Sequence, residues 1–209
     1  MEKLIILLLC SIMLSMPMVE GIAEGPKAVE EWFSKHRHKK EKVTKLHFYF
    51  HDTPSGKNPT VLQVAQANGS STSPTLFGLV FIADDPLTVG PEPNSTLVGR
   101  AQGMYSSASL EDIGLAMNLN FVFTAGKFNG STFSLVGRNQ IFHEYREMAI
   151  VGGTGVFRLA RGIATAKTFT FNTTSGDAVV EYNVMHLMNQ TPLEEFALHM
   201  SINLVLVNG

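Results

Sequence analysis

The sequence predicts a single all-β domain built as a closed antiparallel barrel, and three observations carry this prediction. From Leu46 onward, apolar residues recur mainly at every second position, which is the period of a β-strand. Glycine, asparagine and proline interrupt these runs at short intervals, as they do in antiparallel sheets. The only cysteine, Cys10, lies in an N-terminal segment that we expect to be removed. A closed sheet stabilises a secreted domain that has no disulfide.

Residues 1–23 have the pattern of a secretory signal peptide. A charged start, Met1 to Lys3, precedes an apolar run from Leu4 to Met16, and small residues follow at positions 21–23. The run is shorter than a membrane span. Its removal leaves 15 basic and 16 acidic residues, and this near-neutral balance argues against nucleic acid or an anionic membrane as a partner. We therefore expect a secreted protein.

Asparagine-linked glycosylation sequons support the secretory route. Each used site must lie on the surface, because the glycan is attached to an accessible loop. The asparagine at position 58 is excluded, since a proline follows it. The five predicted sites are Asn68, Asn94, Asn129, Asn172 and Asn189.

Residues 24–44 form a charged lead-in that we expect to be solvated and mobile, with a basic contact to cell-wall polymers as the alternative. The predicted barrel domain occupies residues 45–188. Its strand-like runs follow one another without long amphipathic helices between them, which argues against a doubly wound sheet. A short helical turn is expected at residues 109–112. The predicted strands cover residues 46–52, 75–83, 97–105, 119–125, 132–136, 148–151 and 163–171.

The segment from Arg146 to Gly162 combines closely spaced glycines with three arginines. Residues 152–155 (GGTG) resemble a phosphate-binding loop, but Arg158 stands where the dinucleotide pattern requires glycine, and no P-loop lysine and serine follow. We interpret the glycines as a turn or bulge that bends a strand. No histidine pair has metal-ligand spacing with a supporting carboxylate, and no nucleophile elbow is present, so we predict no metal site and no serine triad.

Asp52 is the most informative acidic residue. It continues the strand face that carries Phe48 and Phe50, so an inward-facing strand places a carboxyl group at the edge of an aromatic cavity. Burial would raise its pKa and make it a proton donor near neutral pH. The alternative is an exposed turn aspartate before Pro54.

Two other strand segments carry polar residues. Arg100 and Gln102 share one face of a predicted strand, and Tyr105 falls on the other face unless Gly103 marks a bulge. Residues 84–86 (DDP) are interpreted as a turn in which aspartate side chains cap the backbone.

Taken together, these segments identify the chain as similar to the plant dirigent proteins over about residues 45–184. No single motif is specific, but their combination and order are. The matching segments are residues 48–52 (FYFHD), 77–78 (FG), 84–88 (DDPLT), 98–103 (VGRAQG), 123–124 (FT), 129–132 (NGST), 137–139 (GRN), 146–148 (REM), 151–155 (VGGTG), 157–158 (FR), 160–162 (ARG) and 181–184 (EYNV).

The resemblance implies an eight-stranded antiparallel barrel, related in shape to lipocalins and allene oxide cyclases and assembled as a homo-oligomer, a trimer or a dimer. It also implies a glycoprotein secreted to the apoplast or cell wall, with no cofactor. A separate laccase or peroxidase would generate phenoxy radicals from monolignols such as coniferyl alcohol, and the barrel would control which faces couple in lignan biosynthesis. This is the leading functional hypothesis. The alternatives are an isoflavanol dehydratase that forms a pterocarpan, and a carrier of hydrophobic phenolics.

The same resemblance assigns roles to individual residues. Asp52 is the candidate acid and Arg146 its electrostatic partner. Protonation of the carbonyl oxygen of a quinone methide makes the methide carbon more electrophilic, so that an internal hydroxyl closes the ring. The candidate substrate-contacting residues are Tyr105, Arg100, Phe50 and Asn139.

Two features depart from the family pattern. Members that control pinoresinol stereochemistry carry an aspartate where this chain has Asn139, which weakens an assignment to pinoresinol. The family's usual ending after residues 181–184 is a short aromatic strand, whereas here different residues follow. We therefore expect residues 185–188 to pair poorly as the closing strand, and residues 189–209 to form an atypical extension with a short helix near Thr191 and an added strand at 202–207.

Overall fold

The computed structural model describes residues 25–38 and 40–189. The predicted signal peptide, residues 1–23, and the predicted helix and strand of the C-terminal extension lie outside the described residues. The chain divides into two units between Ser34 and Lys35. Helix α2 (Pro26–His36) occupies part of the expected lead-in and begins with a proline, whose missing N–H is not needed there. Among the described residues, no helix has the length and apolar character that crossing a bilayer requires.

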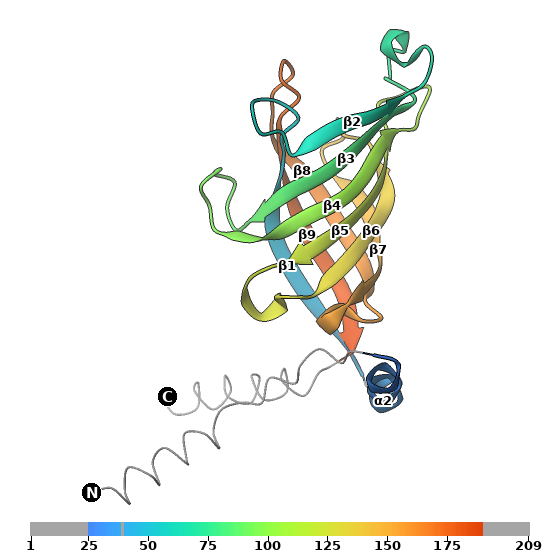
Figure 1. The fold of residues 1–209 in the computed structure, drawn as a ribbon, viewed down its shortest axis with the longest axis vertical. Helices are drawn as coiled ribbons and strands as arrows, with labels where there is room; N and C mark the ends of the chain where they lie inside the picture. Colours follow the sequence, from blue (N-terminus) through green and yellow to red (C-terminus); the bar gives the residue numbers. More distant parts are fainter. Residues whose placement is uncertain (1–24, 39, 190–209) are drawn as a thin grey trace, which may run out of the picture. The chain divides into compact units, whose positions relative to one another are not determined.

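Within the described residues, nine strands form one antiparallel sheet, and eight of them close into the expected barrel (Figure 1). The order around the barrel is β1-β9-β8-β7-β6-β5-β4-β3, with closure by pairing of β3 with β1, while β2 pairs only with β3. The strands are β1 (Glu41–Asp52), β2 (Val61–Gln66), β3 (Leu79–Thr88), β4 (Leu97–Ser107), β5 (Leu115–Phe123), β6 (Thr132–Asn139), β7 (Arg146–Thr154), β8 (Arg161–Phe171) and β9 (Ala178–Asn189).

One edge of β3 pairs with two different strands, and the barrel closes at this edge. The first half of this strand pairs with β2, up to Ala83, and its end pairs with β1 through Leu87 and Thr88. Pro86 lies between the two partners, where the missing N–H removes no ladder hydrogen bond. The strand therefore runs on to Thr88, past the turn expected at residues 84–86. Residues 110–112 form bends, and no helical turn is present at residues 109–112.

Strand β9 is fully paired, so the expectation of poor pairing at residues 185–188 is wrong. It pairs with β1 from Asp52↔Ala178 to Glu41↔Asn189, and with β8 as far as Arg161↔Leu187. The alternation of buried and exposed side chains continues through this part of β9, since Val184 and His186 are buried and Met185 is exposed. Strand β1, the partner of β9, begins at Glu41, which falls inside the expected charged lead-in. Both guanidinium terminal nitrogens of Arg161 donate to the Glu41 carboxylate.

One end of the barrel interior is filled by aromatic rings. Phe133 packs against Phe121 with ring centroids 5.1 Å apart and against Phe157 at 5.4 Å. These three side chains are fully buried. Small residues on other strands, Ala101, Ala164 and Ala166 among them, point into the same interior and leave room for the rings. The packed core thus lies at this end, and the opposite end is hollow.

The glycine segment of β7 forms a bulge, as the sequence predicted. Ser134 of β6 pairs with Gly152 and the next residue, Leu135, pairs with Ile150, so Val151 is the extra residue. A Cβ on Gly153 would lie 2.5 Å from the Thr132 carbonyl oxygen and 2.7 Å from the Phe157 Cβ. Gly153 is therefore required for close backbone approach, and it allows the following turn to place Phe157 in the core.

We expect Gly153→Val to lower the free energy of unfolding by about 1–3 kcal/mol or more, because the new side chain overpacks this contact. Gly152→Ala is the matched control, since no atom lies within 4 Å of the position of its Cβ. This control should change stability by less than about 0.5 kcal/mol. Urea unfolding followed by circular dichroism measures both. Equal effects of the two substitutions would contradict the packing argument.

His186 is buried in the aromatic end without a polar partner. It is 1% exposed, and its ring packs edge to face on Phe157 at 5.1 Å. Neither ring nitrogen has a hydrogen-bond partner among the described residues. Burial lowers the pKa of His186 to about 4. The imidazole is therefore neutral in the folded protein at mildly acidic pH.

This burial predicts a loss of stability in acid. In the unfolded chain His186 is protonated below a pKa of about 6.5, whereas in the folded protein it stays neutral down to about pH 4. Between these two pH values the unfolded state binds one more proton, so the free energy of unfolding falls by about 1.4 kcal/mol per pH unit. We expect His186→Phe to remove this contribution. The check is the stability difference between variant and wild type, measured at pH 7 and again at pH 4.5. A difference that does not grow in acid would show that His186 protonates freely in the fold.

Candidate functional site

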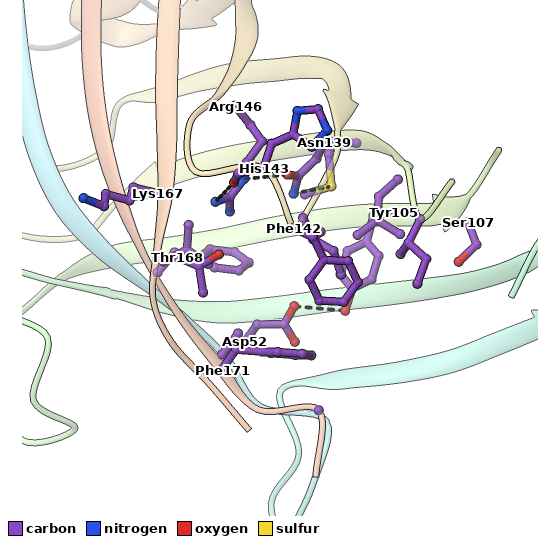
Figure 2. Close-up of a pocket in the computed structure, with 18 of the residues that line it drawn as sticks. Asp52, Tyr105, Ser107, Asn139, Phe142, His143, Arg146, Lys167, Thr168 and Phe171 are labelled. Atoms are coloured by element: carbon purple, nitrogen blue, oxygen red, sulfur yellow. Dashed lines mark hydrogen bonds between the residues drawn. The ribbon is translucent and has the colours of Figure 1, made fainter. Parts of the chain in front are cut away.

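The hollow end of the barrel contains a cavity of about 500 Å³ (Figure 2). This volume falls within the range of about 300–1,000 Å³ that is typical of small-molecule sites. Apolar and aromatic side chains make up much of the wall, including Phe50, Phe81, Leu115, Val180 and Phe171. Two separate groups of polar side chains lie in the cavity, and Ser107, Lys167 and Thr168 line other parts of its wall.

The first group is Asp52 with Tyr105. Asp52 ends β1 on the face of the buried Phe48 and Phe50, so it lies in the cavity and is not an exposed turn residue. The Tyr105 hydroxyl donates a hydrogen bond of 3.0 Å to Asp52 Oδ2. Burial raises the pKa of Asp52 to about 6, against the opposing effect of the Tyr105 hydrogen bond. At mildly acidic pH this carboxyl group is a proton donor.

The second group surrounds Arg146, on the other side of the cavity in Figure 2. Its Nε donates to Asn139 Oδ1 at 3.1 Å, and its Nη1 donates to the His143 carbonyl oxygen at 3.4 Å. The Asn139 amide donates to the Met117 sulfur at 3.8 Å. Arg146 is 4% exposed, and burial lowers its pKa.

Arg146 forms no salt bridge with a carboxylate within the described ranges. Its contacts are neutral, so its buried positive charge is complementary to an anionic oxygen of a ligand. This arrangement corrects the expected pairing of Asp52 with Arg146, because the hydrogen-bond partner of Asp52 is Tyr105.

Three of the four predicted substrate-contacting residues, Phe50, Tyr105 and Asn139, line the cavity. The fourth, Arg100, does not. Its Nε donates to Asp84 Oδ1 at 2.5 Å on the outer surface of the barrel. The pairing of β4 with β3 and β5 is regular through Gly103, so Tyr105 faces inward and Arg100 outward. The role of Arg100 is thereby corrected to a structural ion pair.

Sequence reasoning missed several polar residues of the barrel interior, and two of them, Asp85 and Tyr182, lie at or near the cavity. Asp85 is fully buried and accepts a 2.5 Å hydrogen bond from Thr60 Oγ1, although it was expected to cap a turn. The signal was the alternation that continues through residues 79, 81, 83, 85 and 87, all of which point inward. Tyr182 is 1% exposed, stacks on Phe48 with ring centroids 5.9 Å apart and contributes to the cavity wall. Its position on the inner face of β9 was the corresponding signal.

Four of the predicted glycosylation sites, Asn68, Asn94, Asn129 and Asn172, are exposed. The side chain of Asn189 lies outside the described residues. Glycosylation at all five remains a prediction. Within the described part of the chain, no three histidine, cysteine or acidic side chains lie together in a way that would hold a metal ion.

Comparison with known proteins gives consistent matches. A family model described as Dirigent-like protein matches residues 43–187. Dirigent protein 21 of Arabidopsis thaliana is 59% identical over 147 residues, which cover 70% of this chain and 78% of that protein. Pterocarpan synthase 1 of Glycyrrhiza echinata is 54% identical over 145 residues, covering 69% and 77%. The solved structure of a pterocarpan synthase dirigent protein has a TM-score of 0.68 at 50% identity, covering 73% of this chain and 88% of that one.

The raised pKa of Asp52 predicts that this carboxyl group destabilises the fold at neutral pH. The folded-state pKa of about 6 exceeds the unfolded value of about 3.9, so stability is lost as the pH rises through this window. We expect Asp52→Asn to be more stable than wild type at pH 7.5, by up to about 3 kcal/mol, and to lose that advantage at pH 4. Urea unfolding at the two pH values measures the effect. The same stability difference at both would show that Asp52 ionises without penalty.

Proposed function

Because the chain belongs to the dirigent family, we propose that it binds a phenolic substrate in the barrel cavity and closes a ring by dehydration through a quinone methide, as an isoflavanol dehydratase. The observation that carries this proposal is the separation of an acid with a raised pKa, Asp52, from a buried cation with neutral hydrogen-bond partners, Arg146, across a largely apolar cavity. The reaction needs a proton at one end of the substrate and stabilisation of negative charge at the other.

The first step breaks a benzylic carbon–oxygen bond. Asp52 gives its proton to the benzylic hydroxyl, which leaves as water, and the phenol conjugated to that carbon releases its proton to solvent. The electron pair of the phenolic oxygen forms the quinone methide. Arg146 stabilises the negative charge that builds up on this oxygen.

The second step forms the ring. A second phenolic hydroxyl of the same molecule attacks the methide carbon, and its proton passes to the Asp52 carboxylate. The quinone methide oxygen takes up a proton from solvent and becomes a phenol again. One water is lost overall, and Asp52 returns to its protonated state without an oxidant or cofactor in the balance.

Similarity to pterocarpan synthases supports this choice among the hypotheses. Two such proteins, of Glycyrrhiza echinata and Glycine max, are 54% and 53% identical to this chain. The side chain of Asn139 also favours the dehydratase hypothesis. A neutral amide at this position orients Arg146 and leaves its charge available to the substrate oxygen, whereas an aspartate would compensate it.

The second candidate is stereochemical control of monolignol radical coupling, with radicals from a laccase or peroxidase. The stacking of Phe81 on Tyr105, with centroids 5.1 Å apart, supports it because such a wall orients flat phenolic rings. Coupling also yields a quinone methide, so the same acid would act in both reactions. In either case we propose a protein secreted to the apoplast, in agreement with the predicted signal peptide and sequons.

We expect the purified protein to convert a 2′-hydroxyisoflavanol to the pterocarpan with no oxidant present, as measured by chiral chromatography. Asp52→Asn should lower the rate by at least about 100-fold, the lower range for loss of a general acid. Arg138→Gln is the control, because Arg138 is exposed and pairs with Asp112 outside the cavity.

Parallel reactions separate the alternatives. Enantiomeric enrichment of coniferyl alcohol products only when laccase is added, with no isoflavanol turnover, would replace the first proposal with the second. Saturable binding of phenols with neither outcome would identify a carrier.

A further inference from the structure

We propose that Asp52 and Asp85 form a carboxyl pair that shares a proton inside the barrel, in which Asp85 is a positioning residue that acts through Asp52. The pairing deepens the proposed function, and its catalytic consequence rests on that function. The proton sharing itself is a property of the protein without substrate, so it can be tested separately.

The strand register directs the two carboxyl groups toward the same part of the barrel interior. Strand β1 pairs with β3 at Tyr49↔Thr88 and Phe50↔Leu87. Continued by two residues along each strand, the same register sets Asp52 across from Asp85, on the inward face that Phe50 and Leu87 share. The pairing itself ends at Phe50↔Leu87, and the two carboxyl groups lie close enough beyond it that the negative charge of Asp52 raises the pKa of Asp85.

The hydrogen bonds leave one unsatisfied oxygen on each carboxyl group. Asp52 Oδ2 accepts from Tyr105, and Asp85 Oδ1 accepts from Thr60. Asp52 Oδ1 and Asp85 Oδ2 are both buried and have no hydrogen-bond partner among the described residues. Two unpartnered carboxylate oxygens in a buried site are costly, and a proton held between the two groups satisfies both at once.

The loop between β1 and β2 fixes which oxygen of Asp85 is left over. The Thr53 N–H donates to Thr60 Oγ1 at 3.1 Å, and the Thr60 N–H donates to the Thr53 carbonyl oxygen at 2.8 Å. Because Thr60 Oγ1 accepts from Thr53, its own hydrogen is directed to Asp85 Oδ1. Only Oδ2 of Asp85 remains for a proton.

Burial and the nearby carboxylates raise the pKa of Asp85 more than its other neighbours lower it. Burial raises the pKa of Asp85 to about 8, and the negative charge of Asp52 adds to this effect. The Thr60 hydrogen bond and Arg100 on the outer face oppose the rise, and Asp84 contributes to it weakly.

Asp52 faces two further groups. Tyr105 favours its ionised form, and the charge of Asp177, in the loop before β9, favours its protonated form. A pair in this setting loses its protons in two coupled steps, so it keeps one proton to higher pH than a single buried aspartate would.

The test follows the aspartate carboxyl carbons by ¹³C NMR across a pH titration of the full chain without substrate. We expect two coupled steps in the wild type, the upper one near pH 8. In Asp52→Asn, a variant expected to fold well, the midpoint of Asp85 should fall by one pH unit or more, because the like charge is gone. Asp84→Asn is the control and should leave the upper step in place. An Asp85 midpoint that stays near pH 8 in Asp52→Asn would overturn the proposal.

Asp85→Asn adds a kinetic readout. If the proposed function holds, the basic limb of its pH–rate profile moves to lower pH, whereas a purely structural role for Asp85 would lower the rate without moving the limb. If the wild type turns over no isoflavanol, the proposed function fails, and the NMR titration still decides the pairing.

Discussion

Closure of the barrel between β1 and β3 is the constraint on which the site depends. Strand β1 pairs with β9 along its whole length but with β3 at only two positions. Strand β2 pairs with the rest of the same edge of β3. A buried hydrogen bond of 2.6 Å between His51 Nε2 and Thr88 Oγ1 strengthens the short seam. Where the seam ends, the strands separate, and Asp52 and Asp85 point into the space that opens.

The cavity is formed at the expense of stability. Burial raises the pKa of both Asp52 and Asp85 and lowers the pKa of Arg146, so each is held where its ionised form is disfavoured. Such sites persist only when the surrounding structure fixes them strongly. Here the continuous hydrogen-bonded ring of strands and the aromatic core at the other end supply that support.

Local periodicity was enough to predict the antiparallel strands and to place Phe48, Phe50 and Asp52 on one strand face. The missing disulfide and the family resemblance indicated the closed barrel, and the glycines of β7 indicated a turn or bulge. Local periodicity failed where the pairing of distant strands decides which face of a strand points inward. The inward face of β4 could be the one with Arg100 or the one with Tyr105, and only the pairing with β3 and β5 selects Tyr105. Asp85 was missed because the turn chemistry of residues 84–86 concealed an alternation that continues through Pro86.

The distance between the two polar groups has a physical reason. A guanidinium beside a buried carboxyl group favours ionisation and lowers the pKa of that group. An Asp52 paired with Arg146 would therefore be a carboxylate at the pH where an acid is required. Tyr105 hydrogen-bonds Asp52 without adding charge, and Asn139 orients Arg146 without neutralising it. Burial keeps the pKa of Asp52 raised, and the neutral partner of Arg146 leaves its charge available, which is the division that the proposed quinone methide chemistry requires.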